Sequence, residues 1–151
     1  MRHKVAGFKL GRDKAHRNAL LRNLVTSVIE RERVITTITK AKAAKPLVDR
    51  MITLAREDSL HARRQAAQFL MTPESVQKLF DKLGTRFGQR EGGYTRVVRL
   101  GFRKGDGAES AMLELVGSEL VKRAAERAKR REERLKAIQQ GREDEGGEEE
   151  K

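Results

Sequence analysis

The sequence contains no cysteine and no tryptophan, only two prolines and one tyrosine, and no long hydrophobic run. Without cysteine, the chain can form neither disulfide bonds nor thiolate metal sites, although this leaves the cellular compartment open. None of its apolar runs approaches the roughly 18 residues that a membrane span needs, and its N-terminus lacks the apolar core of a signal peptide. Because aromatic side chains are so few, surfaces that stack the bases of single-stranded nucleic acids should be scarce.

The residue constellations that catalysis requires are also missing. The three histidines, His3, His16 and His61, lie far apart with no second ligand at metal-binding spacing, so we expect neither a metal nor another cofactor. Glu30 and Glu32 are interpreted as ordinary surface charges rather than as an acid–base pair. No glycine-rich phosphate-binding motif occurs, and the GDG segment fits a turn. We therefore predict that the chain is not an enzyme and has no small-molecule substrate.

Positive charge is what the sequence has in excess. Among 151 residues, Lys and Arg number 34 and Asp and Glu 22, which gives a net charge of +12. Residues 1–116 hold 24 basic and 12 acidic side chains, whereas residues 117–151 hold ten of each. Such an excess indicates a nucleic acid or an anionic membrane as partner, and we favour nucleic acid. The change of balance predicts a binding domain, residues 1–116, followed by an extension, residues 117–151.

The first sixteen residues form a basic arm with almost no apolar surface to bury. Ordering a backbone costs about 1–2 kcal/mol per residue, so we expect residues 1–16 to be extended and to become ordered on a polyanion, through ion pairing and counterion release. A frayed N-terminus that happens to be basic is the alternative. The candidate nucleic-acid contacts of the arm and of the helix that follows are Arg2, His3, Lys4, Lys9, Arg12, Lys14, His16, Arg17 and Arg22.

The spacing of apolar and β-branched residues predicts an α+β domain. Helices are expected at residues 16–30, 39–56, 60–70 and 73–83. Strands are expected at residues 34–38, 94–102 and 110–116, the last two forming an antiparallel hairpin.

The ends of the predicted helices carry recognisable signals. Thr39, Ser59 and Thr72 are expected to be N-caps, and Gly84 is expected to end the fourth helix. Pro46 interrupts the second helix, which should therefore be kinked or begin nearer Lys45.

Further basic side chains lie on or beside these elements. Lysines at the start of the second helix oppose its dipole, at a cost of about a few tenths of a kcal/mol, which indicates an external anion. Arginines can grip phosphate oxygens with paired hydrogen bonds, although each could equally be an ordinary solvated side chain. Tyr94 could stack on a base, but a half-buried strand tyrosine is the simpler interpretation. The candidates of this group are Lys40, Lys42, Lys45, Arg63, Arg64, Tyr94, Arg96, Arg99, Arg103 and Lys104.

From Ser118 onward, the sequence predicts an exposed, charged helix. Acidic residues precede basic ones by four positions, as Glu119 precedes Arg123, and each such pair stabilises a helix by about 0.2–0.5 kcal/mol. The apolar stripe is thin, so we expect a solvated helix that ends near Gly141. The acidic, glycine-interrupted tail that follows is expected to be disordered.

Three stretches closely resemble the bacterial large-subunit ribosomal protein family numbered seventeen: GRDKAHRNALLRNLVTSVIERERVITTITKAKAAKPLVDRMITLA, LHARRQA and GGYTRVVRLGFRKGDGAESAMLELV. The resemblance covers residues 1 to about 116, and the segment from about Gly117 lies beyond the end of shorter members. It implies a two-layer α+β fold in the order α-β-α-α-α-β-β, with helices packed on a small three-stranded sheet. It also implies binding to large-subunit rRNA near the peptide exit tunnel, contact with neighbouring large-subunit ribosomal proteins, and a cytoplasmic location.

We therefore expect a structural constituent of the large ribosomal subunit whose basic arm and helix starts neutralise rRNA phosphates. RNA should be recognised mostly through its backbone and shape. A free DNA-binding or nucleoid protein would use the same charge, but no recognition-helix signature or dimer seam is evident. A protein-interaction module acting through the C-terminal helix is a further alternative, and it could act in addition to rRNA binding.

Overall fold

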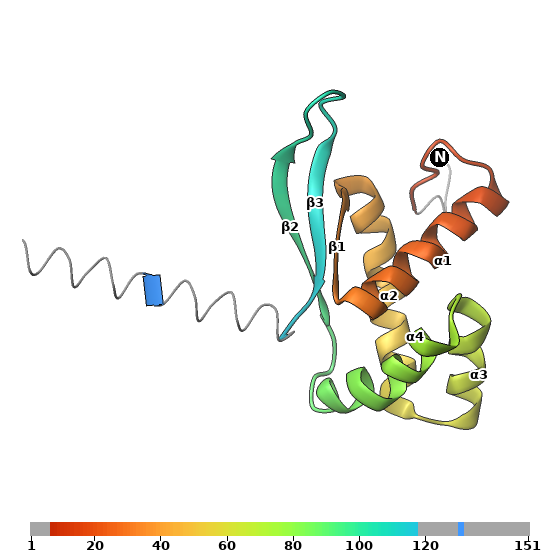
Figure 1. Ribbon diagram of the computed structural model, residues 1–151. Coiled ribbons are helices and arrows are strands. Elements are labelled where there is room, and N and C mark those ends of the chain that lie inside the picture. Colours follow the sequence, from red (N-terminus) through yellow and green to blue (C-terminus); the bar gives the residue numbers. More distant parts are fainter. Residues whose placement is uncertain (1–6, 118–129, 132–151) are drawn as a thin grey trace, which may run out of the picture. The chain divides into compact units, whose positions relative to one another are not determined.

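The computed structural model describes residues 7–117 together with Arg130 and Arg131. The chain divides into two units, residues 1–116 and 117–151. In the first unit, the helices lie on one side of a small sheet (Figure 1), and the element order α-β-α-α-α-β-β confirms the expected α+β fold. The charged helix and acidic tail expected after Ser118 lie outside the described residues, except that Arg130 and Arg131 are helical. No helix in the described part of the chain is long and apolar enough to cross a membrane.

The first helix, α1 (Lys14–Arg31), begins earlier than predicted because Asp13 caps it. Oδ1 of Asp13 accepts a hydrogen bond from the main-chain N–H of His16 at 2.9 Å, which satisfies one of the free donors at the helix start. Before the helix, the N–H of Arg12 donates to the carbonyl of Lys9 at 3.2 Å, closing a turn. The described end of the arm is therefore a turn and a helix start rather than an extended segment, and residues 1–6 lie outside the description.

The strand β1 (Arg33–Thr37) passes directly into α2 (Ile38–Glu57). The N-cap of α2 is therefore Thr37 rather than the predicted Thr39, and the Thr37 hydroxyl makes no capping hydrogen bond. Pro46 lies inside one continuous helix, so a start near Lys45 is wrong. Buried side chains lie on both sides of the proline, for example Ala44 and Val48, and their burial offsets its cost of about 3 kcal/mol.

The caps predicted for the next two helices are confirmed. The Ser59 hydroxyl accepts from the N–H of Ala62 at the start of α3 (Leu60–Phe69), and Thr72 caps α4 (Pro73–Lys78), which has proline at its first position. Gly84, however, does not end the fourth helix. A π-helical segment, η1 (Leu79–Gly84), continues it and packs on α2, and residues 85 and 86 are still helical. A β-carbon at Gly84 would lie 2.7 Å from the Ala55 carbonyl oxygen of α2, so glycine is required by this close contact.

The sheet has the strand order β1-β3-β2, with β2 (Thr95–Phe102) and β3 (Glu109–Leu115) forming the predicted antiparallel hairpin. Leu113 on the central strand is fully buried, and its neighbours in register are Val34 and Val97. These residues face the helices and complete the core with α1 and α2. The alternate positions face away, and there Ile35 is 67% exposed.

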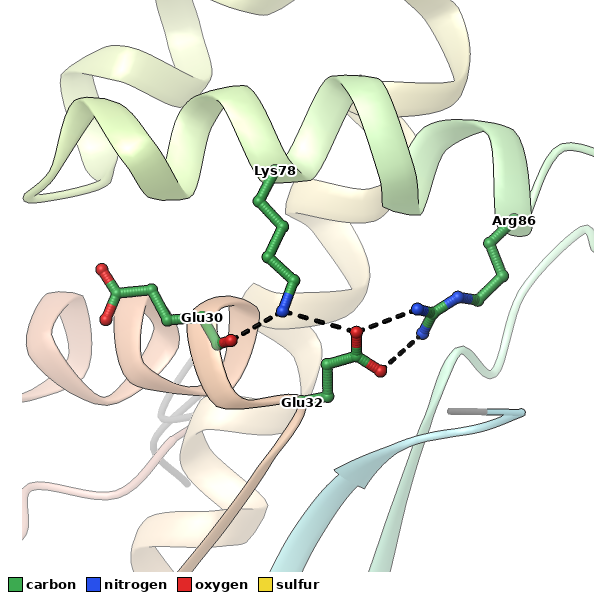
Figure 2. Close-up of polar contacts among 4 residues, drawn as sticks. All are labelled: Glu30, Glu32, Lys78 and Arg86. Atoms are coloured by element: carbon green, nitrogen blue, oxygen red, sulfur yellow. Dashed lines mark hydrogen bonds and ion pairs between the residues drawn. The ribbon is translucent and has the colours of Figure 1, made fainter. Parts of the chain in front are cut away.

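Glu32 fixes the corner between α1 and β1 (Figure 2). It is the C-cap of α1, in the left-handed region with φ +62°, and its main-chain carbonyl accepts from the N–H of Leu115 at 2.8 Å. Its carboxylate accepts two hydrogen bonds from the Arg86 guanidinium, at 2.8 and 2.9 Å, and lies 3.4 Å from Nζ of Lys78. Lys78 also donates to the main-chain carbonyl of Glu30 at 2.6 Å.

This cluster corrects the interpretation of Glu32 as an ordinary surface charge. Its side chain is only 15% exposed. The hydrogen bonds from Arg86, reinforced by the charges of Arg86 and Lys78, outweigh its partial burial and lower the pKa of Glu32 below the ordinary value of 4.5.

Replacing Gly84 by Ala should lower the free energy of unfolding by about 1–3 kcal/mol, because the added methyl must displace the main chain of α2 rather than a mobile side chain. Gly88→Ala is the matched control, since a β-carbon there would lie 3.4 Å from its nearest neighbour, the Thr85 carbonyl oxygen. Urea denaturation measures both variants. Equal stability of the two would show that η1 and α2 do not pack tightly at Gly84.

Replacing Glu32 by Gln should lower the free energy of unfolding at pH 7 by about 1.5–3 kcal/mol, the range for hydrogen bonds to charged groups. Because folding lowers the pKa of Glu32, its stabilisation is complete above the unfolded pKa and disappears as the pH falls through the folded pKa. The difference in urea midpoint between parent and variant should therefore shrink on acidification below the ordinary glutamate pKa of 4.5.

Glu30→Gln is the control for this experiment, because the Glu30 carboxylate accepts only from the Thr72 hydroxyl among the described residues. It should reduce stability less than Glu32→Gln at pH 7. If the difference in urea midpoint between the parental chain and Glu32→Gln did not change with pH, packing rather than ionisation would account for the effect of the substitution.

Candidate nucleic-acid interface

Three segments rich in basic residues lie at one end of the domain. β1 pairs antiparallel with β3, so that Thr37 lies beside Ser110, close to the β2–β3 turn. α2 begins at this point. β1 runs back beside α1, so the start of α1 lies on the same side of the domain (Figure 1). We call residues 7–17, 38–45 and 99–109 the cationic end.

Lysines and one histidine at the cationic end have no side-chain partner among the described residues. The acids there, by contrast, are all engaged. Asp13 caps α1, Asp106 forms an ion pair with Arg103, and Glu109 lies 3.1 Å from Arg99. The positive charge of this end is therefore not neutralised within the described domain. The basic residues without a partner are Lys9, Lys14, His16, Lys40, Lys42, Lys45 and Lys104.

A groove of about 440 Å³ lies between α1 and the start of α2. Its polar lining comes from His16, Asn23, Ser27, Thr36 and Lys40. The first N–H groups of α2 receive no side-chain cap, and a helix N-terminus carries about half a positive charge. Lysines placed beside such a terminus raise the local potential further, so the groove and its rim favour an anion such as a phosphate group.

Three arginines of the N-terminal region are used to hold the fold. Nε and an Nη of Arg22 donate to the carbonyls of Phe69 and Gln68 at 2.7 and 3.0 Å, which ties α1 to the end of α3. Arg17 donates to the carbonyl of Arg12 at 3.1 Å, and the Arg12 guanidinium donates back to the carbonyl of Leu10 at 2.7 Å. These contacts fold the turn before α1 onto the helix.

Arg63 and Arg64 lie apart from the cationic end. They belong to α3, which follows the C-terminal end of α2, and a helix of 20 residues is about 30 Å long. Arg63 forms an ion pair with Asp58 at 2.6 Å and lies over the ring of Phe80, 4.7 Å from its centroid. Arg64 is exposed and has no side-chain partner in the described part of the chain.

The arginines of the hairpin have exposed side chains and form ion pairs, although Glu114, the partner of Arg96, is itself buried. Arg96 lies 3.9 Å from Glu114. In the turn, the pKa of Asp106 is lowered to about 2, mainly by the hydrogen bond that its carboxylate accepts from Arg103. The more exposed pairs of Arg99 and Arg103 contribute little to stability, so these guanidinium groups remain able to bind a second anion.

The burial of Tyr94 supports the simpler of its two sequence interpretations and removes it from the candidate RNA contacts. Tyr94 is only 2% exposed; its hydroxyl accepts from an Nη of Arg56 at 3.0 Å, and its ring packs edge-on against Phe87. It therefore belongs to the core and cannot stack on a base. Sequence analysis missed Phe102, which is 80% exposed. The sequence signal for this exposure was that Phe102 is the last apolar residue before a glycine-rich turn. The end of a hairpin often extends past the neighbouring strands.

Arg2, His3 and Lys4 lie in residues 1–6, outside the described structure. Within the described part of the chain, no group of three His, Asp or Glu side chains could hold a metal ion.

Comparison with known proteins gives a consistent result. A sequence model of the family described as ribosomal protein L17 matches residues 20–116. A protein of Solibacter usitatus, named large ribosomal subunit protein bL17, is 76% identical over 145 residues, which cover 96% of this chain and 97% of that protein. The protein of the same name from Koribacter versatilis is 58% identical, with 92% of this chain and 90% of that protein covered.

A shorter relative shows how the extension varies. The protein of the same name from Chloroflexus aurantiacus is 50% identical over 116 residues, which cover 77% of this chain and all of that protein. The alignment with the Solibacter protein is 145 residues long, so it continues well into the extension. Some relatives therefore share the extension and others lack it. The match of the family model and the identity to these relatives show that the chain belongs to the ribosomal protein L17 family.

Proposed function

We propose that the chain is a structural constituent of the large ribosomal subunit that binds large-subunit rRNA through its cationic end. The observation that carries this proposal is the concentration of lysines without a described partner at an end whose described acids are all engaged. Family membership supports the large subunit as the assembly, because the relatives are named as its proteins. A free DNA-binding protein would use the same charge, so family membership, and not charge, separates the two functions.

Binding would rest on phosphate contacts from the start of α2 and from the β2–β3 hairpin. Lys40, Lys42 and Lys45 place ammonium groups along the first part of α2, where the uncapped helix start adds its own positive potential. Lys104 and the arginines of the hairpin would reach further phosphates beside the β2–β3 turn. Each neutralised phosphate releases counterions, which supplies affinity without reading sequence. Recognition would therefore depend on the RNA backbone and shape.

Other contacts complete the proposal. Arg64, exposed on α3, would form a second and separate phosphate contact, with Arg63 beside it. The basic residues of the arm, Arg2, His3 and Lys4, would add further contacts. We further propose a site near the peptide exit tunnel, beside neighbouring ribosomal proteins in the cytoplasm, and the support for it is what the resemblance to the family implies. We infer no catalytic role, no cofactor and no membrane contact.

Replacing Lys42 by Ala should weaken binding to deproteinised large-subunit rRNA and flatten the slope of log affinity against log salt by about 0.7–0.9, the value for one phosphate contact. Lys82→Ala is the matched control, because Lys82 is an exposed lysine of η1, without a partner in the described structure and away from the cationic end. It should change neither quantity. Titration at several salt concentrations measures both, and equal effects of the two substitutions would refute the assignment of the interface to the cationic end.

Removing residues 1–12 takes away four cations (Arg2, Lys4, Lys9 and Arg12) but keeps the Asp13 cap. The salt slope should flatten by about 3–4 units if each cation neutralises a phosphate. Removing residues 118–151 takes away ten basic and ten acidic side chains and should change the slope by less than about one unit. A large loss of slope in the second truncation would show that the extension contacts RNA, and that the boundary near residue 117 does not separate binding from non-binding residues.

A further inference from the structure

Phe102 is the most exposed large hydrophobic side chain in the described part of the chain, at 80%. It is the last residue of β2, and Leu100, two residues earlier, is 50% exposed. Leaving a phenylalanine in water forgoes a substantial burial energy, and large exposed apolar groups often mark binding sites. The proposed phosphate contacts do not use this side chain.

The hairpin holds Phe102 on a firm support. The N–H of Arg103 donates to the carbonyl of Ala108 at 2.9 Å, and the N–H of Gly107 donates back to the carbonyl of Arg103 at 3.1 Å. The carboxylate of Asp106 accepts from the Arg103 guanidinium and from the N–H of Ala108, which closes the turn a second time. Phe102 is therefore presented by a braced turn rather than by a loose loop.

The register of the sheet shows which way Phe102 faces. Phe102 pairs with Glu109, and Glu109 shares a face with Ala111, which is fully buried against the helices. Phe102 thus lies on the helix side of the sheet. The last pair between β1 and β3, however, is Thr37 with Ser110, so Phe102 extends one step past β1. Figure 1 shows the hairpin rising beyond β1 on the side where α2 begins.

We propose that Phe102 stacks on an unpaired base of the rRNA bound by the cationic end, an inference that rests on the proposed function. The charges around it favour RNA over an apolar pocket of another protein. Arg99, Arg103 and Lys104 lie within three positions of Phe102, and Lys104 has no acid partner among the described residues. An aromatic ring beside cations is the combination that binds single-stranded nucleotides, because the ring meets the base while the cations meet the phosphate.

The test uses the fact that the chain contains no tryptophan, so Phe102→Trp introduces a single fluorescent indole. Phe102→Trp should bind deproteinised large-subunit rRNA as tightly as the parental chain, and its emission should be quenched by the stacked base. Phe102→Leu keeps an apolar side chain but loses the ring. It should weaken binding about tenfold without changing the salt slope, whereas Lys104→Ala should flatten the slope by about one unit.

Ile35→Ala is the control for a general effect of exposed apolar groups, because Ile35 is 67% exposed on the opposite face of the sheet. It should leave the affinity for rRNA unchanged. Parental affinity in Phe102→Leu, or unquenched emission in Phe102→Trp bound to rRNA, would overturn the stacking while leaving the proposed function intact. A blue shift of the indole emission of Phe102→Trp caused by other large-subunit proteins, and not by rRNA, would also overturn it in favour of a protein pocket. Failure of the parental chain to bind rRNA would overturn both.

Discussion

The contacts of Glu32 join the elements that meet at the end of α1. Through its carbonyl, Glu32 holds β3 beside the start of β1; through its carboxylate, it holds the segment formed by α4, η1 and Arg86 against the end of α1. A residue with a side chain rarely adopts positive φ, yet here the left-handed turn aims the carboxylate at two cations. The same turn sends β1 back along α1, and this reversal brings the starts of α1 and α2 together. The cationic end thus depends on a corner at the opposite end of β1.

The basic residues divide their tasks according to their chemistry. Arg22, Arg56 and Arg86 bind main-chain carbonyls, a hydroxyl or a carboxylate inside the domain, since a guanidinium can serve several acceptors in fixed directions. Most lysines remain unpaired in the described structure, with Lys78 as an exception. The ammonium group is a flexible point charge that suits a phosphate surface of varied geometry. Counting charges in the sequence therefore overestimates how much of the available positive charge comes from arginine and underestimates how much comes from lysine.

Local signals in the sequence predicted what depends on a few neighbouring residues. Ser59 and Thr72 were recognised as caps because a cap binds an N–H three residues away, and the hairpin follows from two strands and a glycine-rich turn. Contacts between distant residues were not predictable in this way. Gly84 looked like a helix end because its close contact with Ala55 is invisible in the sequence. For the same reason, the sequence did not show that Tyr94 is fully buried or that Phe102 is 80% exposed. The joining of β1 to the hairpin followed from the family resemblance, whereas its pairing with β3 and the grouping of the basic segments at one end required the structure.

Both outer strands of the sheet have an edge that no described strand pairs with, and such edges invite other chains to add to the sheet. β1 carries Arg33, and β2 carries Arg96 and Arg99, all exposed. If two copies aligned edge to edge, these arginines would be brought close together and would repel one another. The repulsion acts only while the charges face water or another copy of the chain, and a polyanion removes it. Arginines on the outer strands would thus oppose the self-association of a newly made chain. Once the chain has bound its polyanionic partner, this repulsion is no longer needed.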